Sequence, residues 1–139
     1  TIVVGDGITH LNWALFSELP NLKNVDLGNV EMIDCLFRWC DSLEEIVVPE
    51  TVTHVGACSF IGCKNLKKVE ILADDAMLFW DVFRGAENLE EVHFGKNAKP
   101  AEEGIDLGIS KNATLYVHKN SGMHKYAQRL GYEFVIVEN

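Results

Sequence analysis

The sequence predicts an α/β solenoid, with short parallel strands stacked on one face and turns and short helical segments on the other. Three repeating features predict it. A leucine opens a unit at spacings of 21, 23 and 23 residues, at Leu22, Leu43, Leu66 and Leu89. A phenylalanine precedes each leucine by six residues, at Phe16, Phe37, Phe60 and Phe83. A β-branched residue follows three positions after each leucine, at Val25, Ile46, Val69 and Val92. Such a fixed period indicates a repeat architecture.

Each unit begins with the pattern L-x-x-V-x-L, which predicts a short strand whose alternate side chains point inward. The last position of the pattern is also large and apolar, at Leu27, Val48, Ile71 and Phe94. One such strand cannot bury its apolar side alone. Successive units are therefore expected to stack in parallel and to share one continuous core.

The second half of each unit carries the chain back across the opposite face. In the third unit this is the segment 55–63, where Gly56 and small residues favour a turn. Phe60 and Cys63, three residues apart, are expected to point inward from a helical turn. A strand and a return in about 23 residues are typical of a leucine-rich repeat solenoid.

The third unit, "LEEIVVPETVTHVGACSFIGCKN", resembles the BspA-like subclass of leucine-rich repeat proteins. The pattern of that subclass places a leucine in the strand, a proline after it, and a glycine, a phenylalanine and a cysteine in the return segment. The third unit matches these positions at Leu43, Pro49, Gly56, Phe60 and Cys63. The resemblance covers almost the whole chain. It weakens in places: the second unit is two residues shorter between its strand and its phenylalanine, and the fifth unit lacks the aromatic residue.

We interpret residues 1–139 as one domain. Residues 1–111 hold four to five repeats of 21–23 residues, and residues 112–139 form a terminal strand and a cap. In the cap, Asn120 or Ser121 is the expected N-cap of a helix that ends at Gly131. Its inward side comprises Met123, Tyr126, Ala127 and Leu130. A final strand containing Phe134 and Ile136 is expected to help cover the last coil.

The N-terminal coil has no comparable cover in the sequence. Thr1 occupies the same position of the repeat as Glu45, so the chain enters in mid-strand. We therefore expect the chain to be a fragment of a longer protein whose upstream repeats cover this edge. A missing cap, or edge-to-edge self-association at the N-terminal coil, would cover it equally well.

The four cysteines follow the repeat. Cys35 and Cys58 share one position, and Cys40 and Cys63 share another. The second position holds Ala86 in the next unit, so it selects small apolar side chains, and we expect free thiols in the core. Disulfides within each pair are an alternative that stacking at about 5 Å permits. A zinc site is disfavoured, because the C-x4-C spacing departs from the usual C-x2-C.

Composition and motif content limit the classes of function that we expect for this chain. A formal net charge of -9 opposes binding to nucleic acid. No apolar run reaches the roughly 18 residues of a membrane span, so no membrane insertion is expected. No catalytic constellation, metal site or phosphate loop stands apart from the repeat, so we expect neither an enzyme nor a cofactor.

The outward strand positions form columns along the stack. One reads Lys23, Glu44, Lys67, Glu90, and the next Asn24, Glu45, Lys68, Glu91, so charges largely alternate. This alternation favours a ladder that supports the register. The third column reads Asp26, Val47, Glu70, His93, Tyr116 and mixes charge with apolar bulk. We predict a partner-binding surface here that takes in Asp26, Val47, Lys68, Glu70, Glu91, His93 and Tyr116.

Three tryptophans belong to the opposite, turn-bearing side. Trp13 and Trp80 share a position three residues before a phenylalanine, and Trp39 follows Phe37 by two. We expect them to be partly buried over the phenylalanine column rather than to stack on a ligand.

The family resemblance implies a function. BspA-like proteins are commonly surface-exposed or secreted adhesion and host-interaction factors, which implies a protein or glycan ligand and an extracellular or cell-surface location. Free thiols argue instead for a reducing compartment. The alternative function is a structural spacer that positions another domain without a ligand of its own.

Overall fold

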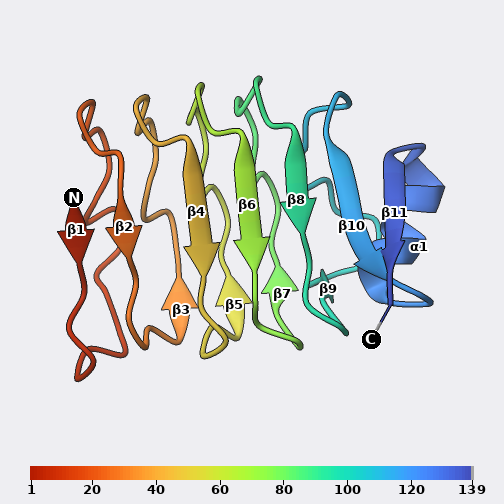
Figure 1. Cartoon of the computed structure of the whole chain (residues 1–139), viewed down its shortest axis with the longest axis horizontal. Coiled ribbons are helices and arrows are strands. Elements are labelled where there is room, and N and C mark those ends of the chain that lie inside the picture. Colours follow the sequence, from red (N-terminus) through yellow and green to blue (C-terminus); the bar gives the residue numbers. More distant parts are fainter. Residues whose placement is uncertain (139) are drawn as a thin grey trace.

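The strands lie across the long axis of the molecule and follow one another along it, from the N-terminal coil to the C-terminal cap (Figure 1). The computed structural model describes residues 1–138. One face carries a five-stranded parallel sheet in the order β11-β10-β8-β6-β4. Its strands are β4 (Glu45–Val48), β6 (Lys68–Ile71), β8 (Glu91–His93), β10 (Thr114–His118) and β11 (Glu133–Val137). β1 (Ile2–Val3) and β2 (Val25–Asp26) form a separate pair.

Equivalent residues of successive units lie beside one another, as the period predicts. Ile46 pairs with Val69, Val69 with Val92, and Val92 with Leu115. The inward residues of these strands are buried. The predicted leucine-rich repeat solenoid is confirmed.

The opposite face differs from the expectation in one respect. It holds the expected turns, but a second parallel sheet takes the place of the short helical segments. This sheet consists of β3 (Met32–Ile33), β5 (His54–Val55), β7 (Met77–Leu78) and β9 (Lys99–Pro100). In the part of the chain that the structure describes, helix occurs in the cap alone.

Backbone conformation explains why these segments are not helical. Two positions of every coil adopt positive φ. The first is occupied by Ala14, Cys35, Cys58, Asp81 and Gly104, and the second by Glu18, Trp39, Gly62, Gly85 and Gly108. A residue in the left-handed conformation ends a right-handed helical turn. Two such residues within a stretch of five leave too few residues between them to form a helical turn.

The core contains a spine of phenylalanines. The ring centroids of Phe16 and Phe37 are 5.8 Å apart, those of Phe37 and Phe60 5.7 Å, and those of Phe60 and Phe83 5.7 Å. Phe37, Phe60 and Phe83 are fully buried, whereas Phe16 in the first coil is half-buried. The spine confirms that like residues stack in columns.

The strand face is interrupted between β2 and β4, which belong to different sheets. The same two coils remain paired on the opposite face, through β3 and β5 and through the amide of Phe37, which donates to the carbonyl oxygen of Ser59. The coil that starts at Leu22 is the one that is two residues shorter. A shorter perimeter cannot keep both faces in register with a longer neighbour, so one face separates.

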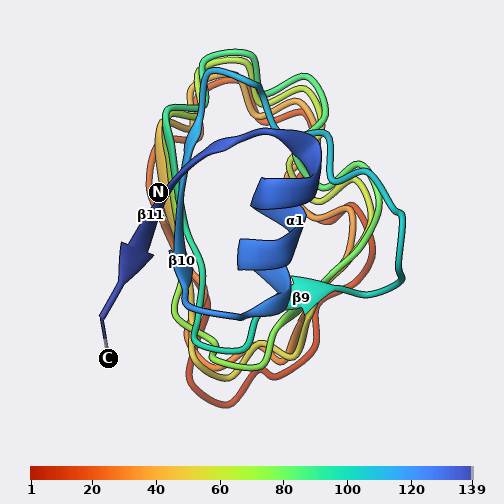
Figure 2. The same cartoon turned by 90° about the vertical axis from the view of Figure 1, so that its right-hand side faces the viewer.

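The cap is built largely as predicted. Helix α1 (Gly122–Leu130) begins at the N-cap Ser121, which accepts from the His124 amide, and ends at Gly131 with a φ of 73°. Met123, Tyr126 and Ala127 are buried. Seen along the solenoid, α1 lies inside the outline of the coils and closes the core (Figure 2).

The expected role of β11 in covering the core is only partly fulfilled. Phe134 is half-buried, but Ile136 is 38% exposed. β11 lies beside β10 as the outermost strand of the sheet (Figure 1). The helix supplies the apolar cover, so the closing strand contributes mainly backbone hydrogen bonds.

Candidate functional site

The strand face, meaning the outward side chains of the first sheet, carries the third column in the predicted order. Val47 pairs with Glu70, Glu70 with His93, and His93 with Tyr116. Val47 is 45% exposed. These four side chains therefore form one continuous line across β4, β6, β8 and β10.

His93 and Tyr116 are in direct ring contact within this line. Their rings stack with centroids 4.1 Å apart and planes inclined by 7°. Nε2 of His93 also lies 2.9 Å from a carboxylate oxygen of Glu91 on the same strand. The imidazole is thus held on two sides, and the half-buried pair presents an aromatic surface to solvent.

The predicted charge ladder is present only in part. Lys67 pairs across coils with Glu44 at 3.6 Å. Lys68 instead pairs with Glu70 on its own strand at 2.6 Å, although its neighbours in the column are Glu45 and Glu91. The hydrogen bond from Lys68 lowers the pKa of Glu70. Pairs this exposed contribute little to stability, so stacking is held mainly by the core.

Asp26 is separated from the rest of the predicted surface. It lies on β2, beyond the interruption, and its carboxylate accepts from the Gly28 amide at 3.0 Å. Asp26 therefore stabilises the turn after its strand. Val47, Lys68, Glu70, Glu91, His93 and Tyr116 lie together on one sheet.

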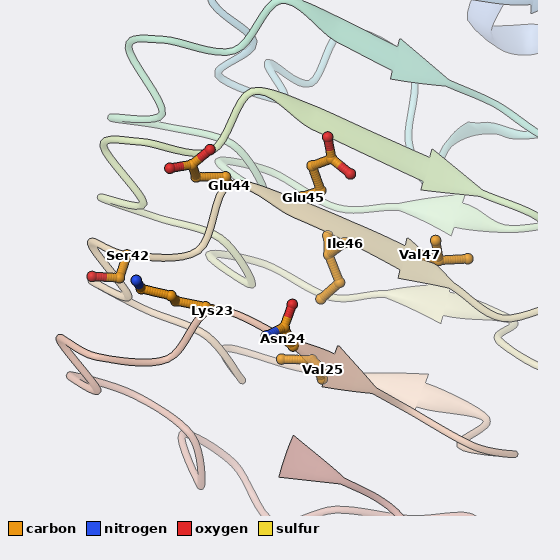
Figure 3. Close-up of a pocket in the computed structure, with 8 residues that line it drawn as sticks. All are labelled: Lys23, Asn24, Val25, Ser42, Glu44, Glu45, Ile46 and Val47. Atoms are coloured by element: carbon orange, nitrogen blue, oxygen red, sulfur yellow. The ribbon is translucent and has the colours of Figure 1, made fainter. Parts of the chain in front are cut away.

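A groove follows the interruption of the strand face. Its first part has a volume of about 530 Å³ and is lined by Lys23, Asn24, Val25, Ser42, Glu44, Glu45, Ile46 and Val47 (Figure 3). The Ile46 side chain is directed across it toward Asn24 and Val25 (Figure 3). A second part of about 430 Å³ shares Val25 and Val47 and continues toward Pro49 and Leu72. Sequence analysis missed the groove, although the shorter second unit was its signal.

The thiols lie in the core, as predicted for the stacked cysteines. Cys35, Cys40 and Cys63 are buried and Cys58 is half-buried, and all four are free. Burial raises the pKa of Cys40 and Cys58, and raises that of Cys63 to about 12. Protonated thiols are poor nucleophiles, so these residues have a packing role.

Residues 1–138 contain no group of three or more His, Cys, Asp or Glu side chains placed to hold a metal ion. The charged residues that line the first groove, Lys23, Glu44 and Glu45, are exposed to solvent. Such a surface is suited to contact with another molecule.

The tryptophans on the turn-bearing side are more exposed than expected. Trp13 is 61% exposed, Trp39 43% and Trp80 54%. Arg38, which the sequence analysis did not single out, lies over two of them. Its guanidinium carbon is 5.5 Å from the ring centroid of Trp13 and 4.3 Å from that of Trp39.

Within residues 1–138 no helix has the length and apolar character needed to cross a membrane.

Comparison with known families identifies the repeat. A family model described as the BspA type leucine-rich repeat region matches residues 1–105 in six copies. Comparisons with curated proteins and with solved structures gave no match. The matched region spans most of the chain and contains every coil from β1 to β9. The chain therefore belongs to the BspA-type leucine-rich repeat family.

Proposed function

We propose that this chain is a non-catalytic binding module of a surface-exposed or secreted protein, which contacts a protein or glycan ligand through its strand face. The observation that carries the proposal is the groove between β2 and β4, with the exposed Val47 on its border. Repeat solenoids commonly use the face of their stacked strands for binding.

Backbone geometry supports a ligand at the groove. β2 and β4 are not joined in one sheet, so the facing edges of the two strands lack the ladder that links the other coils. A ligand that forms hydrogen bonds with these edges replaces the missing backbone pairing. The same ligand covers the apolar side chains of Val25 and Val47. Exposed apolar side chains beside free strand edges are typical of surfaces that accept a partner.

The stacked pair His93 and Tyr116 supports a wider contact along the same face. A tyrosine whose ring is already held loses little conformational freedom on binding, which favours aromatic residues at contact hot spots. The line from Val47 to Tyr116 is therefore proposed as the contact surface. Its mixed charges favour a specific ligand over a general polyanion.

The alternative function is a structural spacer. A regular core with the Phe16 to Phe83 spine would serve that role without any ligand. A spacer needs its core but not its surface. The two functions therefore differ in how they respond to changes on the strand face.

The test compares two exposed valines of the strand face, Val47 on β4 and Val135 on β11, where Val135 pairs with Tyr116. Val47 and Val135 are each 45% exposed, but only Val47 borders the groove. Wild type, Val47→Ser and Val135→Ser are tested by biolayer interferometry against purified extracellular-matrix proteins and a panel of immobilised glycans. We expect at least one probe to bind the wild type and to bind Val47→Ser about tenfold more weakly, with Val135→Ser unchanged.

Thermal unfolding followed by circular dichroism checks that both variants keep the wild-type fold. Equal loss in the two variants would place the contact outside the groove. Absence of binding to every probe would favour the spacer.

A further inference from the structure

The turn-bearing side holds Arg38, whose guanidinium lies between the exposed Trp13 and Trp39. No carboxylate of residues 1–138 forms an ion pair with Arg38. Its Nε is shielded from solvent and has no hydrogen-bond acceptor among the described residues. The protein therefore leaves this donor unpaired, although an unsatisfied buried donor is costly, and because Nε is shielded, a ligand from solvent reaches the guanidinium through its terminal nitrogens.

A second arginine, Arg84, occupies the same position of the repeat and does have acidic partners. Arg84 follows Phe83 as Arg38 follows Phe37. Arg84 pairs closely with Asp81 and lies 4.0 Å from Asp106. In the coil of Arg38, the position of Asp81 is taken by Cys35. The acid that neutralises one arginine is therefore absent beside the other.

A neighbouring thiol does not replace that acid. Arg38 acts electrostatically on Cys58, but burial raises the pKa of this thiol, which is therefore uncharged at neutral pH. No ion pair within residues 1–138 therefore balances the charge of this guanidinium, in a protein whose net charge is -9.

The exposure of Trp13 is a property of its position in the repeat. Trp80 has the same position in a coil with neighbours on both sides and is 54% exposed, close to the 61% of Trp13. The first coil therefore presents its indole outward for the same reason as the fourth.

Trp39 is held in an unfavourable backbone conformation. Its φ is 54°, and the next three coils place glycine at this position, at Gly62, Gly85 and Gly108. The indole rests on Gly62, where an added Cβ would lie 2.1 Å from Cδ1 of Trp39. A bulky residue in the left-handed region costs of the order of 1 kcal/mol, and strain of this kind concentrates at functional sites.

We propose that Trp13, Arg38 and Trp39 form a binding site for a sugar ring that carries a carboxylate, such as a uronic acid unit of a glycan. The site lies on a different surface from the strand face, so it stands independently of the function proposed above. Arg38 donates to the carboxylate, and an exposed indole packs against the C–H face of the ring.

The chemistry of the three side chains selects this ligand. A guanidinium that stacks on an indole keeps its N–H donors in the ring plane, where they match the two oxygens of a carboxylate. The negative face of an indole attracts the weakly positive C–H groups of a pyranose. The net charge of -9 disfavours a polyanion, which favours a ligand with one charge and one ring over a nucleic acid.

The experiment follows the three indole N–H signals by nuclear magnetic resonance while methyl β-glucuronide is added. Methyl β-glucoside, which has the same ring without the carboxylate, is the matched probe. We expect the Trp13 and Trp39 signals to shift along one saturating curve, with a Kd on the order of 1 mM. The Trp80 signal should stay in place, and the glucoside should produce no saturable shift.

Two matched variants assign the effect to Arg38. Arg38→Gln is expected to weaken binding about tenfold or more, through loss of the charge-assisted hydrogen bonds. Arg84→Gln, in the same position of the repeat, should leave the Kd within about twofold. Thermal unfolding of both variants checks that their folds are retained.

Any one of the following results would overturn the proposal. They are an equal response to the glucoside, an equal loss of binding in the two arginine variants, and shifts of Trp80 as large as those of Trp13. Tighter binding of a hexaglutamate peptide than of the glucuronide, at the same two indoles, would replace the sugar with an acidic peptide and would also overturn it.

Discussion

The thiol of Cys63 donates a hydrogen bond to the carbonyl oxygen of Phe37, with Sγ 2.9 Å from the oxygen. Cys40 makes the same contact one coil earlier, to the carbonyl oxygen of Phe16 at 3.0 Å. Each thiol thus satisfies a backbone acceptor of the preceding coil in the core. The cysteine position links neighbouring coils as well as filling space between them.

Replacing Cys63 with alanine should therefore cost more than the lost volume. We expect Cys63→Ala to lower the free energy of unfolding by about 1–3 kcal/mol, because a buried carbonyl loses its donor and a small cavity forms. The fold should be retained, because Ala86 occupies this position in the next coil. Urea unfolding measures the change. Cys58→Ala, at a half-buried position, is the control and should cost less than about 1 kcal/mol. Equal costs would contradict a linking role for Cys63.

The raised pKa of Cys63 predicts a loss of stability at alkaline pH. Burial raises this pKa from 9.0 to about 12, so the folded state keeps a proton that the unfolded state releases above about pH 9. Stability conferred by the neutral thiol is therefore complete below pH 9. It declines between about pH 9 and 12, by up to about 1.4 kcal/mol per pH unit. Urea unfolding across this range should show a shallower decline for Cys63→Ala. Parallel curves for wild type and variant would show that other groups cause the decline.

Thiol reactivity should separate the four cysteines. Cys58 is half-buried, whereas Cys40 and Cys63 are fully buried. In the native protein, Ellman's reagent should modify Cys58 first, and the buried thiols should react only as fast as the molecule opens. Mass spectrometry of peptides after short exposure identifies the modified residue. Modification of all four at one rate would mean that the coils separate readily.

The phenylalanine spine should dominate the stability of the repeats. Phe60 is fully buried between Phe37 and Phe83. Phe60→Ala is expected to lower the free energy of unfolding by about 3–5 kcal/mol. Phe16→Ala should cost clearly less, because Phe16 is half-buried and has one stacking neighbour in the spine. Urea unfolding compares the two variants, and similar losses would argue against a continuous spine.

Gly62→Ala should disturb Trp39. A Cβ at Gly62 would meet the indole at 2.1 Å, in addition to the strain of an alanine at a φ of 71°. Gly104→Ala is the matched control, because Gly104 has a φ of 85° with no atom within 4 Å of an added Cβ. We expect about 1–2 kcal/mol of destabilisation at Gly104, a larger one at Gly62, and a shift of the Trp39 indole signal only in Gly62→Ala. An unchanged indole signal would mean that Trp39 does not rest on Gly62.

Several features of the candidate surface were predictable and others were not. The third column from Val47 to Tyr116 was predictable, because strand residues one period apart must lie side by side. The pairing of Lys68 with Glu70 was not predictable, because a long lysine side chain can reach acidic residues on its own strand as well as on the neighbouring strands. The absence of short helical segments from the second face was not predictable, because positive φ at Cys35 or Trp39 is uncommon for these residue types.

The amino-acid sequence by itself determined the stacking of coils, the phenylalanine spine and the burial of the thiols. Each of these depends only on the period, because repeated units that share one core place their equivalent residues side by side. The tertiary structure decided the interruption between β2 and β4, the exposure of Ile136 and the meeting of Arg38 with Trp13. These features arise where adjacent coils differ in length or in side chains, so they depend on how two unlike coils fit together in space.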